Sequence, residues 1–233
     1  MDVTAILREL EALGTERTKQ AYLRQGAREP LFGVATGAMK PILKRTGRNQ
    51  TLADALYATG NYDAMYLAGM IADPKVMTEA DFDRWMEGAY CGMAAEFIVS
   101  VTLAETEIAQ AVSDHWIASG RELNMSAGYS CYCWLLGSRK DGEFNTEKLA
   151  QMLDTVEKTI HHSPGGARYA MNNFVMTVGV SYLPLHEKAL ATANAIGAVE
   201  LPGDKRAVPS ASEEIRKAAA KGRLGFKRKN VRC

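Results

Sequence analysis

Two carboxylates stand out in the sequence because each lies in an apolar, helix-like stretch. Glu96 falls within "YCGMAAEFI", and Asp63 precedes "AMYLAGMIA". A carboxylate in an apolar helix is either on the exposed face or buried beside a partner that changes its pKa. Asp63 follows a glycine and an asparagine, so we expect it to cap the next helix by accepting main-chain N–H bonds. Both are candidates for chemistry that needs an anion, with an ordinary structural role as the alternative.

Basic side chains gather in two parts of the chain. Residues 15–48 carry eight Lys or Arg and two acids, and residues 215–233 carry eight and none, whereas residues 49–214 carry eleven and twenty-two. Such segregation is typical of a protein with an acidic partner, and contacts to phosphate position a protein on DNA without reading its sequence. The side chains expected to contact DNA are Lys40, Lys44, Arg45, Arg48, Arg168, Lys227, Arg228 and Lys229. A solvated basic face is the alternative, and the tail could instead pack against the acidic part of the chain.

Four other stretches, two of which overlap, hold residues that could bind a ligand. "YSCYCWLL" (129–136) offers aromatic rings for base stacking, but on a helix these side chains surround the axis, so we expect most to be buried. "HHSPGG" (161–166) has no accompanying thiol or carboxylate cluster, so we expect the end of a helix and no metal. The glycine-rich turns "FGVATG" and "SPGGAR" precede helices and are interpreted as helix turns first and phosphate contacts second.

The composition limits the class of protein. Of 233 residues, 47% are hydrophobic and 24% charged, which is typical of a globular protein. No run of about 18 apolar residues could span a membrane, and the acidic, amphipathic start does not resemble a signal peptide. The cysteines are few and unevenly spaced, so reduced thiols, a cytoplasmic location and no cofactor are expected. They are Cys91, Cys131, Cys133 and Cys233.

Hydrophobic periodicity predicts helices along almost the whole chain. Helices of about 12 residues are separated by short turns, and pairs of them recur at roughly 35–40 residues. This pattern indicates an all-α, HEAT-like helical-repeat solenoid, with an irregular helical bundle as the alternative. No run of strands is predicted, because the β-branched stretch "FIVSV" has helical flanks.

The clearest break in the pattern is the segment 198–211, which contains two prolines and a glycine. Residues 1–211 are therefore predicted to form a single helical-repeat domain. Residues 212–233 are predicted to be a short helix, capped at Ser212 and ended at Gly222, followed by a mobile basic tail.

Four longer stretches resemble the DNA alkylation repair family of HEAT-like-repeat proteins. They are "YLRQGAREPLFGVATGAMKPILKR" (22–45), "TGNYDAMYLAGMIADPKVMTEADFDRW" (59–85), "RYAMNNFVMTVGV" (168–180) and "GRLGFKRKNVRC" (222–233). The family includes glycosylases that excise positively charged alkylpurines. The resemblance covers nearly the whole chain and implies an all-α solenoid that binds double-stranded DNA.

The resemblance also implies a reaction centre, which the sequence matches only in part. The family's glycosylases use a carboxylate to stabilise the cationic sugar as the base departs, and that position falls at Glu96. The surrounding aromatic positions fall near Gly92 and Asn173, and the arginine near Gly128, so these residue types are not matched. The implied function is DNA binding in alkylation repair, as an alkylpurine DNA glycosylase with Glu96 as catalytic residue. The alternative is a noncatalytic repeat protein that binds nucleic acid or a protein partner.

Overall fold

The computed structural model describes residues 2–201 and 207–232. Within these residues the chain is helical and contains no strand, as the sequence predicts. Two compact units divide it, unit 1 over residues 1–108 and unit 2 over residues 109–233. None of the helices in the described part of the chain is long and apolar enough to cross a membrane.

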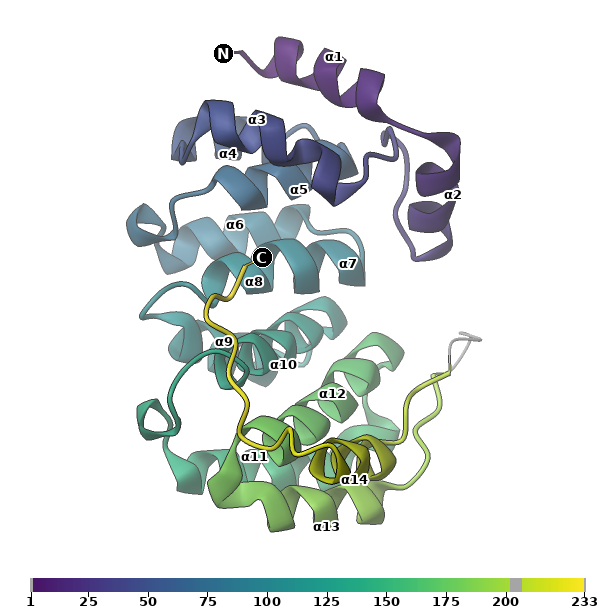
Figure 1. Ribbon diagram of the computed structural model, residues 1–233, viewed down its shortest axis with the longest axis vertical. Helices are drawn as coiled ribbons and strands as arrows, with labels where there is room; N and C mark the ends of the chain where they lie inside the picture. Colours follow the sequence, from purple (N-terminus) through teal and green to yellow (C-terminus); the bar gives the residue numbers. More distant parts are fainter. Residues whose placement is uncertain (1, 202–206, 233) are drawn as a thin grey trace. The chain divides into compact units, whose positions relative to one another are not determined.

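Unit 1 is built from short helices that pack side by side (Figure 1). Helix α5 lies at its centre and contacts α1, α3, α4 and the turn after α7. The elements of unit 1 are α1 (Val3–Leu13), α2 (Glu16–Arg24), η1 (Thr36–Met39), α3 (Lys40–Thr46), α4 (Gln50–Tyr57), α5 (Tyr62–Ile71), η2 (Pro74–Val76), α6 (Glu79–Gly88), α7 (Gly92–Ala94), the π-helical turn η3 (Ala95–Val99) and α8 (Ser100–Leu103).

Residue types at the starts of these helices match their local roles. Thr15, which follows a glycine, caps α2 by accepting from the N–H of Thr18. Thr78 and Asp81 form a capping box at the start of α6, with Asp in the place usually taken by Glu. Pro41 lies in the first turn of α3, where its missing N–H has no helical partner.

Burial of aromatic rings holds the interior of unit 1 together. Trp85 is 1% exposed, and its ring stacks on Tyr57 with centroids 4.3 Å apart. Both polar atoms of this pair are satisfied, because the Tyr57 hydroxyl donates to the Trp85 carbonyl at 2.7 Å and the indole N–H donates to Asp54 at 2.8 Å. A stacked, fully hydrogen-bonded pair fixes α4 against α6.

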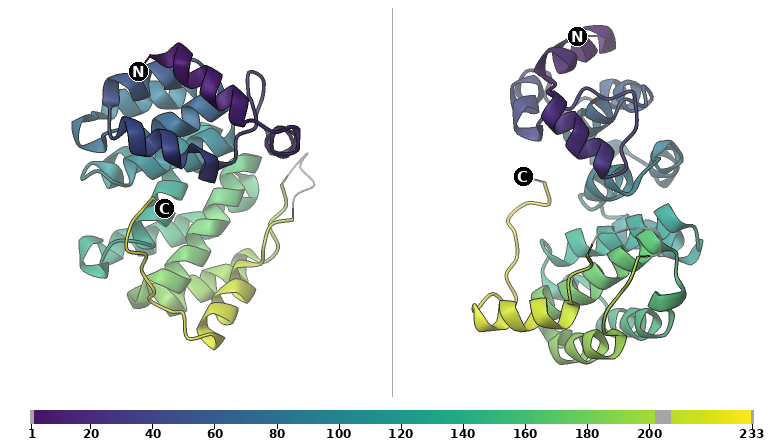
Figure 2. Two further views of the ribbon diagram at one scale, coloured as in Figure 1. Left: turned by 45° about the horizontal axis from the view of Figure 1, so that its top comes forward. Right: turned by 90° about the vertical axis from the view of Figure 1, so that its right-hand side faces the viewer.

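Unit 2 is organised around two long helices, α10 and α12, which pack on each other. Helix α9 covers α10, whereas α13 and α14 lie beside α12, with α11 packed on α13 (Figure 2). The elements of unit 2 are α9 (Ala109–Ala118), α10 (Glu122–Leu136), η4 (Asp141–Glu143), α11 (Thr146–Thr159), η5 (Ile160–His162), α12 (Gly165–Ser181), η6 (Leu183–Leu185), α13 (His186–Ile196) and α14 (Ala211–Ala220).

The aromatic stretch on α10 belongs to this core, as predicted. Tyr129 is 2% exposed and Tyr132 is fully buried, and both rings contact Phe174 of α12. Of the thiols in this stretch, Cys131 is fully buried and Cys133 partly exposed. Burial raises the pKa of the Cys131 thiol to about 12, so it stays protonated at neutral pH.

The N-cap of helix α14 lies two residues before the predicted cap. Ser210 is the N-cap and accepts from the N–H of Glu213, so the expectation that Ser212 caps this helix is wrong. Both serines suit the role, but Ser210 is the one in extended conformation before the first helical residue. Gly222 follows the C-cap with φ of 63°, which confirms it as the residue that ends the helix.

Candidate nucleic-acid interface

Glu96 lies on η3, a π-helical turn between α7 and α8, and is partly buried. The Ser100 hydroxyl donates to the Ala95 carbonyl at 2.7 Å, which helps hold this wide turn. A Cβ atom added at Gly92 would lie 3.3 Å from a Glu96 carboxylate oxygen. A side chain at position 92 would therefore crowd the Glu96 carboxylate, which the glycine leaves room for.

A cation and a thiol share this part of unit 1 with Glu96. The Arg28 guanidinium lies 4.3 Å from the centroid of the Tyr90 ring. Burial raises the pKa of Tyr90 to about 12. Burial also raises the pKa of the Cys91 thiol, with the Arg28 charge opposing and the Glu96 charge adding to that shift. No sequence pattern predicts this cluster, because more than two helices separate Arg28 from the other three residues along the chain.

Asp63 has a structural role different from the one predicted. Its carboxylate is fully buried and accepts three main-chain N–H bonds, from Phe32 at 2.6 Å, Gly33 at 3.0 Å and Val34 at 2.7 Å. The cap of α5 is Asn61, which accepts from the N–H groups of residues 63 and 64. The prediction that Asp63 caps α5 is therefore wrong, because its side chain turns to the preceding loop.

Both glycine-rich turns already hold protein carboxylates. The Asp63 carboxylate accepts from the main-chain N–H groups of "FGV". A Cβ at Gly33 in this turn would lie 2.3 Å from the main-chain nitrogen of Lys19. At the start of α12, the Gly166 N–H donates to Glu122 at 2.6 Å. The interpretation as helix turns is therefore confirmed, and a phosphate at either turn would have to displace a bound carboxylate.

The basic residues predicted on unit 1 differ in how strongly they are engaged. Arg45 pairs with Glu9. Arg48 donates to the Ala72 carbonyl at 3.1 Å and lies 3.3 Å from Glu105. Lys40 and Lys44 are exposed one turn apart on α3, and neither has an ion pair within the described residues. These two lysines are the basic side chains of α3 that a phosphate could reach without breaking a contact.

Arg168 lies on α12 and is partly buried. It donates to the Ser163 carbonyl at 2.7 Å and to the Glu200 carbonyl at 3.2 Å, so it ties two loops to the start of the helix. Because Lys40 belongs to unit 1 and Arg168 to unit 2, the expectation that both contact DNA stays a prediction.

Part of the basic tail contacts unit 2, as in the alternative that the tail packs against the acidic part of the chain, and its mobility stays a prediction. Lys227 donates to the Leu136 carbonyl at 2.7 Å and lies 2.8 Å from Asp141. The Arg228 N–H donates to the Gly137 carbonyl at 2.7 Å, and its guanidinium stacks on Trp134 at 4.6 Å. These contacts satisfy carbonyls at the C-terminal end of α10, where a cation is favoured.

Lys229, unlike Lys227 and Arg228, does not hydrogen-bond to the end of α10. It is exposed and has no ion pair or hydrogen bond among residues 2–201 and 207–232. The tail therefore divides into residues that hold the fold, Lys227 and Arg228, and a cation that is available to a ligand. Cys233 lies outside the described residues.

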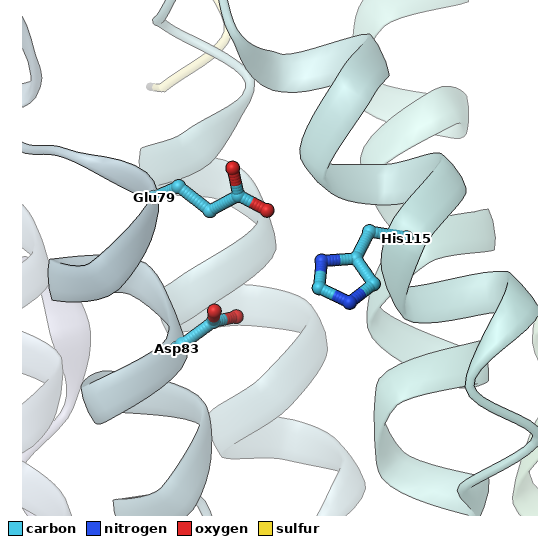
Figure 3. Close-up of side chains that lie close together, drawn as sticks. All are labelled: Glu79, Asp83 and His115. Carbon is cyan, nitrogen blue, oxygen red and sulfur yellow. The ribbon is translucent and has the colours of Figure 1, made fainter.

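Among the residues that the structure describes, no three candidate metal ligands gather within one unit. Figure 3 shows Glu79 and Asp83 one turn apart on α6, pointing to the same side, together with His115 of α9. His115 belongs to unit 2, and two carboxylates on one helix are too few ligands for a selective site. The predicted helix-end histidine His161 contacts the Ile196 carbonyl at 2.8 Å.

Gly128 and Asn173 lie at or near two of the positions that the family resemblance assigns to the reaction centre. A Cβ atom at Gly128 would lie 2.7 Å from both the Ile117 side chain and the Ser113 carbonyl, so the α9–α10 contact excludes a side chain there. Asn173 is partly buried on α12. No arginine could replace Gly128 without separating these two helices, which is the physical reason for the mismatch.

Comparison with known proteins places these observations in a family. The family model described as DNA alkylation repair enzyme matches residues 6–218. Uncharacterized proteins of Listeria innocua and Listeria monocytogenes are each 26% identical over 217 residues, covering 90% of this chain and 94% of theirs. A solved structure is 60% identical, with a TM-score of 0.96 and full coverage of both chains. It is described as a new family of proteins related to the HEAT-like repeat DNA glycosylases, with affinity for branched DNA structures. The chain thus belongs to the DNA alkylation repair enzyme family and has its HEAT-like helical-repeat fold.

Proposed function

We propose that this protein binds DNA and prefers branched DNA over a linear duplex. The observation that carries the proposal is the 60% identity, over the full length of both chains, to the structure described as having affinity for branched DNA. The exposed cations Lys40, Lys44 and Lys229 support it, since each is available for a phosphate. Arg45, Arg48, Arg168, Lys227 and Arg228 contribute to the positive potential while holding partners within the chain.

A competition experiment tests this preference. A labelled four-way junction, a three-way junction and a linear duplex of the same total length are titrated with protein at several salt concentrations. Junction complexes should survive an excess of unlabelled duplex, whereas the duplex complex should be lost. Equal displacement of all three complexes would show general affinity for polyanions and would contradict the preference.

A second candidate function is excision of a cationic alkylpurine with Glu96 as the catalytic carboxylate. The observation in its favour is the partly buried carboxylate on a π-helical turn in a member of this family, since such turns are frequent at functional sites. An anion there would stabilise the positive charge that develops on the sugar. The filled space at Gly128 weighs against this candidate, because the arginine of the family's glycosylases has no room.

Release of methylated purines from alkylated DNA tests the second candidate. If excision occurs, E96Q should lower it by roughly 100-fold while DNA binding is retained. The control is E87Q, which removes a charge from an exposed position on α6. Absence of release by the unchanged protein on several alkylated bases would leave binding without excision as the function.

A further inference from the structure

Phe226 is the most exposed of the large hydrophobic side chains among the described residues, at 67%. It lies within the basic tail, where residues 215–232 contain eight Lys or Arg and no acid. Isolated exposed apolar residues are common and alone signify nothing. What sets Phe226 apart is that the backbone on both sides of it is fixed, so the ring is held outward.

Hydrogen bonds fix the residues on either side. The Gly225 N–H donates to the Val180 carbonyl at 2.8 Å. Gly225 has φ of 72°, and a Cβ there would lie 3.0 Å from Leu183, so only glycine fits without strain. On the other side, Lys227 and Arg228 bind the end of α10 as described above. Figure 1 shows this segment running from α14 to that end of α10.

The segment around Phe226 combines apolar and positive groups. Leu183, which would lie 3.0 Å from a Cβ at Gly225, is 53% exposed. Arg223 and Lys229 flank Phe226 at three residues on either side, and both are exposed. An apolar surface bordered by cations fits a ligand that carries both a flat apolar face and negative charge, and a nucleotide has both.

We propose that Phe226 stacks on an unpaired base at the branch point of DNA, with the neighbouring cations on the adjoining phosphates. In a linear duplex each base face is covered by the next pair, so the ring has nothing to stack on. A branch point leaves base faces uncovered, so the same ring contributes to branched DNA alone. The proposal rests on the proposed function and adds to it the residue that distinguishes the two DNA forms.

The test compares F226A with the unchanged protein on a three-way junction with two unpaired bases and on a linear duplex. Loss of one base–aromatic stack should weaken junction binding about 5- to 150-fold and leave duplex binding unchanged. F226W should retain junction binding, because indole also stacks. The matched control is V76A, which truncates a 60% exposed apolar side chain on unit 1 and should change neither affinity.

A direct probe accompanies the affinities. 2-Aminopurine at an unpaired position should lose fluorescence when the unchanged protein or F226W binds, and keep it with F226A. If the junction is bound with the preference proposed above but F226A binds it equally, Phe226 does not stack and this inference alone fails. If the unchanged protein shows no preference for the junction, the proposed function and this inference fail together. Loss of an apolar protein partner by F226A, with junction affinity intact, would assign the ring to protein binding instead.

Discussion

The carboxylate of Glu122, at the start of α10, accepts a hydrogen bond of 2.6 Å from the N–H of Gly166 at the start of α12. One helix thus supplies the anion that the N-terminus of its neighbour favours. The contact links the two helices that form the centre of unit 2, and it takes the place of a phosphate ligand at this turn.

Replacement of Glu122 should weaken this link. E122A leaves the Gly166 N–H without its acceptor, and we expect the free energy of unfolding to fall by about 1 kcal/mol. E122Q retains an acceptor oxygen and should lose less than half of that. Urea unfolding monitored by circular dichroism measures both variants, and equal stability of E122A and the unchanged protein would show that the bond contributes nothing.

The buried Asp63 carboxylate should be far more sensitive to substitution. Asn has a single acceptor oxygen and directs an amide N–H₂ at donors, so D63N leaves at least one of the three N–H groups unsatisfied. We expect a loss of about 2–4 kcal/mol. The comparison is D54N, whose carboxylate is partly exposed and accepts from the Trp85 indole. If D63N lowers the free energy of unfolding by less than D54N does, the Asp63 carboxylate does not hold the preceding loop in place.

The tail offers a matched pair of lysines. K227A removes the bond to the end of α10 and should lower stability by about 1 kcal/mol, whereas K229A should stay within about 0.5 kcal/mol of the unchanged protein. Both variants lose one positive charge. Thermal unfolding and junction titration of the same samples separate fold from binding, and similar melting temperatures for both would mean that Lys227 is not a structural contact.

The lysine pair on α3 should contribute to affinity through phosphate contacts. K40A/K44A should reduce the slope of log affinity against log salt by about 1–2, because each neutralised phosphate contributes roughly 0.9. K75A/K158A is the control with the same change in charge at exposed sites elsewhere. If the control flattens the slope equally, the contribution is only one of net charge.

The capping box of α6 predicts a pH dependence. The N–H of Thr78 donates to Asp81, and this bond, with the Thr78 hydroxyl and Arg84, lowers the carboxyl pKa. A lowered pKa in the folded state contributes stability above the unfolded pKa that is lost as pH falls through the folded value. D81N should therefore be less stable than the unchanged protein at pH 7 and approach it as the pH falls through the lowered folded-state pKa. A difference that persists unchanged on acidification would assign the effect to hydrogen-bond geometry instead.

Contacts close in sequence were predictable and distant ones were not. The capping box of Thr78 and Asp81 and the stop at Gly222 depend on neighbours within a turn, so residue type and spacing suffice. Asp63 serves a loop 29 to 31 residues earlier, and Lys227 reaches a carbonyl 91 residues away. Such partners depend on how the helices pack, which local patterns do not encode.

The candidate site shows the same division. Glu96 was identified through family resemblance, but its π-helical turn and the Arg28–Tyr90 contact had no sequence signal. The mobile tail was inferred from charge alone, and charge could not reveal that the end of α10 presents carbonyls to two of its residues. The sequence shows that a glycine, Gly128, lies near the position of the family's arginine. The close approach of α9, which requires glycine there, is apparent only in the structure.

The Arg228 guanidinium over Trp134 also gives the protein an intrinsic fluorophore at its tail. The chain has three tryptophans, and the other two, Trp85 and Trp116, are each 1% exposed and shielded from solvent changes. Release of the tail would remove the cation from the partly exposed indole of Trp134 and shift its emission, while the buried pair supplies a constant background. The emission of Trp134 can thus show, in unlabelled protein, whether the tail stays bound to the end of α10 when DNA binds.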